Sequence, residues 1–434
     1  MAQNNRPNIV KIIVHDIGQH IGCYGAGVDT PNMDQMAGEG VSFDQYACTA
    51  AQCSPSRGSI MTGRYPHENG LMGLAHIGWE FHPGEKTLPM YMNEAGYETH
   101  LFGVQHEDSD PSTLGYDHLH DTDELRAKYV ADNVVEFLQE RAKNPGDEPF
   151  YMSCGFAEPH RPYHREGYPK DDPDEVQIQP WLPDRPGIRE DIAGLNGLVR
   201  VVDEQVGRVR QALQETGLQE DTLFIFTTDH GTAQPRAKGT CYDPGIMTAL
   251  IMHQPGVIEG GTVHSELLTN CDFLPTMMEM VGGPEPENIS GRSFWQLIAG
   301  GDYRERDHIF AEMTWHDRYN PMRAIRTNDF LYVRNFGDRP MVYLPLDVWN
   351  GEAGREVAWE YYKDRRPEHQ LYDLQADPLQ MNDVAEDPEY ADTLEELKTT
   401  VHEWMEQTDD PLLLGPVPPV PEQAHRERTR WQPN

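Results

Sequence analysis

The stretch Ile9-Val10-Lys11-Ile12-Ile13-Val14-His15-Asp16 decides how the fold of this chain is interpreted. It is a short, mainly apolar run of strand length that ends in a histidine and an aspartate. In open α/β sheets, ligands bind at the carboxyl ends of the strands. The stretch therefore predicts a buried strand and, directly after it, two polar side chains placed for chemistry.

Similar strand patterns alternate with helical patterns through residues 1–305. We expect further strands at Thr99–Phe102, Phe150–Ser153 and Leu223–Thr227. Between them, apolar residues recur at helical spacing from Tyr129 to Leu138 and from Ile192 to Leu213. This alternation predicts an α/β fold, in which a large and mainly parallel sheet is sandwiched by helices.

The pattern changes from about residue 306. Closely spaced strand patterns lie at 309–313, 322–326 and 330–333, and they predict an antiparallel meander. One amphipathic helix is expected over Leu394–Trp404, and the proline-rich, charged tail from Asp409 is expected to wrap the surface or fray. We therefore expect a large α/β domain over 1–305 and a smaller C-terminal α+β subdomain over 306–434.

The composition is that of a globular protein with an unusual charge. The chain has 434 residues, 38% of them hydrophobic, and a formal net charge of −37 at pH 7. Only eight of its 35 basic residues are lysines, which is typical of a salt-adapted protein. Salt at roughly 1 M shortens the Debye length to about 3 Å and screens such self-repulsion. An ordinary acidic enzyme is the other interpretation left open, and either surface would repel nucleic acid and anionic membranes.

The cysteines and the start of the chain bear on its location. No apolar run approaches the roughly 18 residues of a membrane span, and residues 1–7 lack the apolar stretch of a secretory signal. We therefore expect a cytoplasmic protein. The six cysteines are too dispersed for a disulfide framework. Five of them are expected to be small buried hydrophobic residues: Cys23, Cys48, Cys154, Cys241 and Cys271.

Chemically capable side chains follow four of the predicted strands. The Ile9 strand ends in His15-Asp16, and the Leu223 strand leads to Asp229-His230. His106 follows the Thr99 strand, and Glu158-Pro159-His160-Arg161 follows the Phe150 strand. A single such pair would usually be a solvated turn, but all four are expected to meet at one edge of the predicted sheet. His15, Asp16, Asp229 and His230 predict a divalent-metal cluster with mixed nitrogen and oxygen ligands.

The stretch Cys53-Ser54-Pro55-Ser56-Arg57 adds a further element. Pro55 is typical of the first turn of a helix, so Cys53 is expected beside a helix N-terminus, where free N–H groups favour an anion. Arg57, one turn on, offers a fork of donors suited to a tetrahedral oxyanion.

Cys-x-Pro-x-Arg, followed by Thr62-Gly63-Arg64, resembles the signature of the type I sulfatases. The resemblance spans nearly the whole chain, and it continues through Lys238-Gly239-Thr240 and Leu371-Tyr372-Asp373-Leu374. Within the family, the chain is most similar to the heparan N-sulfatase (N-sulfoglucosamine sulfohydrolase) branch. The stretches similar to that branch are Cys53–Arg57, Asn69–Leu74, Pro159–Arg161 and Pro321–Arg323.

The resemblance implies an alkaline phosphatase-like fold and a sulfatase acting on a sulfate ester or a sulfamate. It implies that Cys53 is oxidised to formylglycine, whose hydrated aldehyde is the nucleophile, and that Arg57 orients it. His106 would handle the proton of the nucleophile, and His160 would protonate the leaving group. Lys238 would contact the sulfate. The metal ligands implied are His15, Asp16, Cys53, Asp229 and His230.

One departure from the family is expected to matter. The family has Lys-x-His where this chain has Val104-Gln105-His106, so one cationic contact is missing. His15 and His230 also stand where Asp and Asn are usual. Because imidazole suits manganese or zinc better than calcium, we favour manganese or zinc as the one divalent ion, with calcium as the alternative.

The expected partners follow from the same resemblance. They are a small or short sulfated saccharide and a formylglycine-generating maturation enzyme, and a homodimer is left open. Polar and aromatic residues on the predicted loops are expected to bind the sugar: His76, Trp79, His316, Asp317, Tyr319 and Arg323.

Two other functions remain open at this point. One is a phosphodiester or phosphonate monoester hydrolase on the same scaffold, since the Lys-x-His is absent. The other is a non-catalytic anion-binding protein, in which Cys53 would stay an unmodified thiol.

Overall fold

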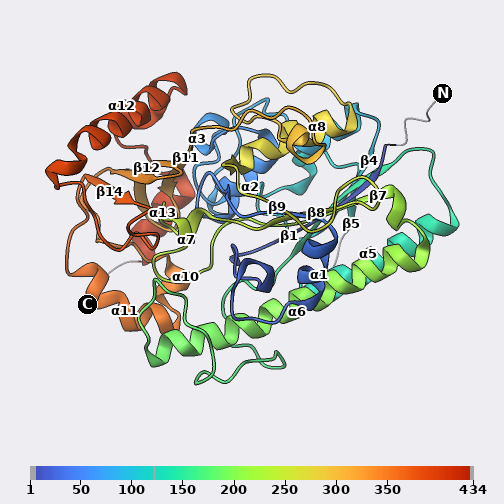
Figure 1. Ribbon diagram of the computed structural model, residues 1–434, viewed down its shortest axis with the longest axis horizontal. Coiled ribbons are helices and arrows are strands. Elements are labelled where there is room, and N and C mark those ends of the chain that lie inside the picture. Colours follow the sequence, from blue (N-terminus) through green and yellow to red (C-terminus); the bar gives the residue numbers. More distant parts are fainter. Residues whose placement is uncertain (1–5, 121–123, 431–434) are drawn as a thin grey trace.

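The computed structural model describes residues 6–120 and 124–430, and it is built on one large sheet (Figure 1). The eight strands lie in the order β5-β4-β6-β1-β7-β8-β2-β9. Their bounds are β1 (Asn8–Val14), β2 (Val41–Phe43), β4 (Glu98–Gly103), β5 (His118–His120), β6 (Phe150–Phe156), β7 (Thr222–Thr228), β8 (Leu250–His253) and β9 (Thr262–His264). Only β8 runs antiparallel to its neighbours β7 and β2. The mainly parallel sheet expected from the sequence is therefore confirmed.

Helices cover both faces of this sheet, and β1 is buried on both sides. Val10, Ile12 and Val14 pack with α5 (Ala127–Lys143) and α6 (Pro186–Thr216) in one core cluster. Ile9 and Ile13 pack on the opposite face with α2 (Cys53–Thr62), α4 (Leu88–Glu94) and α8 (Phe273–Val281). Figure 1 shows α5 and α6 below the sheet and α2 and α8 above it. This arrangement confirms the three-layer sandwich.

A smaller sheet follows as an antiparallel meander. It consists of β11 (His308–Trp315), β12 (Tyr319–Thr327), β13 (Phe330–Asn335) and β14 (His369–Asp373), in that order. The first three match the expected strands. The amphipathic helix α12 (Ala391–Gln407) packs on this sheet through Leu397, Val401 and Trp404. One core cluster contains both Ala47 and Leu331. The two parts of the chain on either side of the proposed domain boundary at 305/306 therefore share this core.

The C-terminal tail returns to the body of the molecule. Asp410 forms a buried ion pair with Arg323 of β12, and α13 (Pro421–Arg430) follows. Among the described residues, no helix is both long enough and apolar enough to cross a bilayer.

Four of the five cysteines expected in the core are there, but Cys23 is exposed. It lies in the short turn η1 (Gly22–Tyr24), outside any apolar periodicity, so the expectation that it is buried was wrong.

Candidate active site

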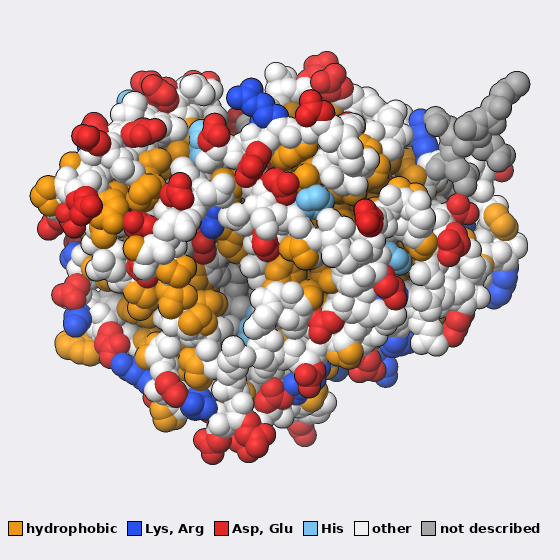
Figure 2. Space-filling model, in the orientation of Figure 1, with side chains coloured by type: hydrophobic (Ala, Val, Ile, Leu, Met, Phe, Trp, Pro, Cys, Tyr) orange, Lys and Arg blue, Asp and Glu red, His pale blue; other side chains and the backbone are white. Residues whose placement is uncertain are grey.

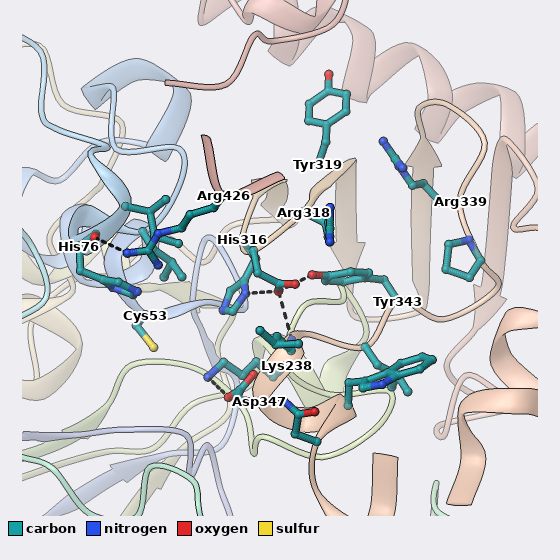
Figure 3. Close-up of a pocket in the computed structure, with 18 of the residues that line it drawn as sticks. Cys53, His76, Lys238, His316, Arg318, Tyr319, Arg339, Tyr343, Asp347 and Arg426 are labelled. Carbon is teal, nitrogen blue, oxygen red and sulfur yellow. Dashed lines mark hydrogen bonds and ion pairs between the residues drawn. The ribbon is translucent and has the colours of Figure 1, made fainter. Parts of the chain in front are cut away.

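A cavity of about 720 Å³ lies where the carboxyl ends of the large sheet meet the C-terminal part of the chain (Figure 3). Cys53, His106, His160 and Lys238 form one side of it. The other side is lined by residues beyond 315, among them His316, Asp317, Tyr319, Arg339, Tyr343 and Asp347. The cavity therefore lies where the strand ends were expected to converge.

Cys53 is the first residue of α2, beside the helix N-terminus as expected. Its side chain is buried, and its Sγ atom lies 3.4 Å from His230 Nε2 and 3.8 Å from Asp16 Oδ1. Burial raises the pKa of the Cys53 thiol, so the unmodified side chain is a neutral thiol at neutral pH. An unmodified Cys53 is therefore a poor nucleophile.

Arg57 lies one helical turn further along α2 and is fully buried. Its Nε donates a hydrogen bond to Asp229 Oδ2 at 3.0 Å. Neither Nη1 nor Nη2 has a hydrogen-bond partner among the described residues. Leaving buried charged donors unpaired is costly, so an anionic ligand that accepted from them would bind well.

Four side chains at the ends of β1 and β7 form a compact group. Asp16, whose φ of 53° is left-handed, donates its backbone N–H to Asp229 Oδ1 at 3.0 Å. His15 Nδ1 lies 3.2 Å from Asp229 Oδ2, outside hydrogen-bond geometry. His230 donates from Nδ1 to the Gly231 carbonyl at 2.8 Å, which turns its Nε2 toward Asp16 Oδ1, 3.0 Å away.

The donor set of this group fits a divalent cation. Ligand atoms of His15, Asp16 and Asp229 lie within 4.8 Å of one another, and so do those of Cys53, Asp229 and His230. Two carboxylates together with imidazole nitrogens are ligands that first-row divalent metals accept. The fixed Nδ1 of His230, and the Nδ1 of His15, which has no hydrogen-bond partner among the described residues, are consistent with that use.

Lys238 links this group to the far side of the cavity. Its Nζ lies 3.1 Å from both carboxylate oxygens of Asp16 and 2.8 Å from Asp347 Oδ2. Burial opposes ionisation of Asp16, but Lys238 and His160 outweigh it and hold the Asp16 pKa well below its usual value. Burial also opposes ionisation of Asp347, but the ammonium of Lys238 outweighs it and lowers the pKa of Asp347. These carboxylates and the ammonium are therefore all charged at neutral pH.

His160 and His106 lie on the cavity side of the group. His160 donates from Nδ1 to the Arg161 carbonyl at 2.8 Å, and its Nε2 lies 3.8 Å from Asp16 Oδ2. The His106 ring packs 4.6 Å from the ring of His15. Burial, reinforced by His15 and Arg57, lowers the pKa of His106 well below its usual value, so this ring is neutral.

The residues expected to bind the sugar divide into two sets. His76, His316, Asp317 and Tyr319 line the cavity. Trp79 and Arg323 do not. Trp79 is buried against Trp315. Arg323 is fully buried and forms its ion pair with Asp410. Their residue types suited a sugar site, but packing places both side chains in the interior. The expectation that Trp79 and Arg323 bind the sugar is therefore not kept.

Several cavity residues had no signal in the sequence. Asp347 comes from the short helix α10 (Leu346–Trp349), and Arg339 and Tyr343 precede it. Tyr343 donates a hydrogen bond to Asp317, which is also bound to His316 Nδ1 at 2.8 Å (Figure 3). Arg426 reaches the cavity from α13. None of them belongs to a motif, and only the packing of the second sheet brings them here.

Family models match most of the chain. A model described as "Sulfatase" matches residues 7–283. A second, described as "N-sulphoglucosamine sulphohydrolase, C-terminal", matches residues 233–345.

Individual relatives agree with these models. An ulvan-active sulfatase of Formosa agariphila is 27% identical over 93% of this chain and 76% of its own length. The human N-sulphoglucosamine sulphohydrolase is 26% identical over 94% of this chain and 92% of its own length. A solved structure in complex with its substrate, D-glucosamine-2-N, 6-O-disulfate, superposes with a TM-score of 0.72 at 22% identity, covering 93% of this chain and 98% of that one.

Proposed function

The chain belongs to the sulfatase family and hydrolyses a sulfate ester or sulfamate, and we propose that it does so on a short sulfated saccharide, through a formylglycine made from Cys53. The observation that carries this proposal is the position of Cys53. It stands at a helix N-terminus in the cavity with its Sγ near Asp16 and His230, and Arg57, one turn on in the same helix, has two donors without a partner among the described residues. When formed, formylglycine supplies a hydrated aldehyde as the nucleophile.

The side chains around Cys53 suit the binding of a sulfate group. The two unpaired guanidinium nitrogens of Arg57 and the ammonium of Lys238 supply positive charge, which offsets the negative charge of the oxyanion. His106, with a neutral ring and an Nδ1 that has no partner among the described residues, is placed to take a proton from the nucleophile.

His160 is proposed as the acid that protonates the leaving group. Its Nδ1 donates to the Arg161 carbonyl, so a second proton on Nε2 makes the ring an imidazolium. Nε2, the atom that would carry the transferred proton, lies 3.8 Å from Asp16 Oδ2. His160 is also the part-exposed member of the group, which suits transfer to a departing oxygen or nitrogen on the cavity side.

We propose that His15, Asp16, Asp229, His230 and the modified residue 53 hold one divalent ion. A bound cation would supply further positive charge for the sulfate. The imidazole nitrogens favour manganese or zinc over calcium. Elemental analysis of protein purified without added metal, followed by reconstitution of the stripped enzyme, tests the choice. Full recovery with calcium alone, and none with manganese or zinc, would contradict it.

The charge of the cavity supports a small anionic substrate. Acidic side chains are spread over the face shown in Figure 2, and the net charge is −37. Yet the cavity wall carries Arg318, Arg339, Arg365 and Arg426. A long polyanion would meet the acidic surface, whereas a short saccharide entering end-on would meet mainly these cations. The ulvan-active and N-sulphoglucosamine relatives are named for sulfated saccharides, in agreement with this class.

The decisive test combines mass spectrometry of the peptide around Cys53 with activity assays. Coexpression with a formylglycine-generating enzyme should raise both the modified fraction and the activity in parallel. Cys53→Ala should abolish turnover, whereas Cys154→Ala, at another buried cysteine, should retain it. Full activity with only unmodified thiol at position 53 would overturn the mechanism.

A substrate panel tests the reaction itself. Val104 stands where the family has a cationic contact. Because that contact is missing, aryl phosphodiesters and phosphonates are the alternative substrates that the panel must exclude. Aryl sulfate and sulfamate should be turned over fastest. Faster turnover of the phosphorus esters would reassign the enzyme, and no turnover of any by the modified protein would favour a binding role.

A further inference from the structure

A second cluster of histidines and a carboxylate lies at the other end of β4, away from the cavity. Glu98 and His100 are two positions apart in β4, and His118 and His120 are two positions apart in β5. Because side chains in a strand repeat every two residues, all four lie on one face of the sheet. His100 and His118 are direct partners in the parallel pairing of the two strands. The ring of His100 packs against Phe137 of α5, which covers this face.

The geometry of three of these side chains is that of a metal site. Glu98 Oε1 lies 3.0 Å from His118 Nε2 and 3.7 Å from His100 Nε2, and each of the three residues offers one potential ligand atom within 4.8 Å of the other two. Tetrahedral zinc with bonds of about 2.0–2.1 Å requires ligand atoms roughly 3.3 Å apart. The distances from Glu98 Oε1 to the two histidine nitrogens, 3.0 and 3.7 Å, lie on either side of that value.

The second observation is the unpaired nitrogen of His100. The residue is only 2% exposed, and its Nε2 has no hydrogen-bond partner among the described residues although it points toward Glu98. Its Nδ1 lies 3.0 Å from His120 Nε2, so an Nδ1–H donated to His120 leaves the Nε2 lone pair free. Arg141 binds the other oxygen of Glu98. Metal-binding histidines and carboxylates are commonly held in this way by outer partners.

We propose that Glu98, His100 and His118 bind a zinc ion that fastens the edge strand β5 to β4. Within the described chain β5 pairs with β4 alone, through three residues. An ion bound by both strands would therefore stabilise this short pairing. The half-exposed His118 leaves the site open to solvent, and a water molecule can complete the coordination. The site is separate from the cavity, because the span from Glu98 to Gly103 alone is about 16 Å.

Zinc binding to His118→Ala and to a matched control tests the proposal. His402 is the control, because it is equally exposed and also pairs with a glutamate, Glu406, but lies on α12. After equilibrium dialysis against zinc chloride, wild-type protein and His402→Ala should hold about one zinc more per chain than His118→Ala. The added zinc should also raise the melting temperature of wild type and not of His118→Ala. Sulfatase activity should be unchanged in both variants, which shows that they are folded.

Zinc at the cavity is distinguished by a second variant. Asp16→Asn combined with Asp229→Asn should lose any zinc of the cavity and keep the zinc of the β4–β5 cluster. His100→Gln should behave as His118→Ala does. The proposal is overturned if His118→Ala holds as much zinc as wild type, or if the cavity variant holds none.

Discussion

The two sides of the cavity differ in how their charges are held. On the strand-end side, Asp16, Asp229, Arg57 and Lys238 are at most 1% exposed, and each lies within about 3 Å of an opposite charge. On the C-terminal side, Arg318, Arg339 and Arg365 are partly or fully exposed on irregular segments. The buried charges are held in place by close ion pairs, which suits chemistry, whereas the exposed ones face the solvent side of the cavity, which suits substrate selection. Changes on the first side should therefore act on kcat, and changes on the second on KM.

The largest effect is expected at His160. General acid catalysis contributes about 10²–10⁴-fold, so His160→Ala should lose activity in that range on sulfated sugars, whose leaving groups are poor. On activated aryl sulfates, which need no proton, the loss should be small. A leaving-group series measured on wild type and variant checks this, and equal losses throughout would assign His160 to binding.

A tenfold effect is expected where the two sides join. Asp347 accepts a hydrogen bond from the Lys238 ammonium, and a hydrogen bond to a charged group contributes about 1.5–3 kcal/mol. Asp347→Asn should lower kcat about tenfold or more, because Lys238 loses one of its two anionic partners. Asp364→Asn, at an exposed Lys-Asp pair, is the control and should have no effect. A change in KM alone would place Asp347 with the binding residues.

A smaller effect is expected at Arg339. Its guanidinium is part-exposed and lies 5.6 Å from the ring of Tyr319. Because exposed ion pairs contribute up to about 1 kcal/mol, Arg339→Ala should raise KM for a sulfated disaccharide by about two- to fivefold. The KM for a small aryl sulfate should not change. Arg355→Ala, at an exposed pair outside the cavity, serves as control, and equal changes in both variants would argue against a role for Arg339.

The smallest effect concerns salt. Screening of the −37 charge should raise the melting temperature by a few degrees as potassium chloride is added up to about 1 M. The same screening should weaken substrate binding at the exposed arginines, so KM should rise while kcat holds. A melting temperature that is flat or falling would exclude the salt-adapted interpretation.

The sequence was informative where function depends on local pattern. His15-Asp16, His106, His160 and Asp229-His230 follow strands whose apolar runs are visible in the sequence, so their convergence could be predicted. Cys53 could be placed at a helix start because Pro55 marks the first turn. These predictions required only that parallel strands end at one edge.

The sequence was silent where tertiary packing decides. Asp347 lies in the four-residue helix α10 and Arg339 in the irregular segment before it, and nothing local indicates that they turn toward Lys238 and Tyr319. Trp79 and Arg323 show the converse, since their residue types suited a sugar but their neighbours are Trp315 and Asp410. The short edge strand β5 was also missed, because three residues carry no periodicity.

The burial of Cys53 has a consequence for the order of events during biosynthesis. Only 2% of this residue is exposed, and the cavity beside it is lined also by residues beyond 315 and by Arg426 near the C-terminus. All ten residues of α2, Cys53 among them, are buried, so the folded chain offers a maturation enzyme little access to the thiol. Under the proposed mechanism, oxidation of Cys53 is therefore expected before this part of the chain folds. In that mechanism a chain that folds before it is modified lacks its nucleophile, so the active fraction is expected to depend on competition between modification and folding.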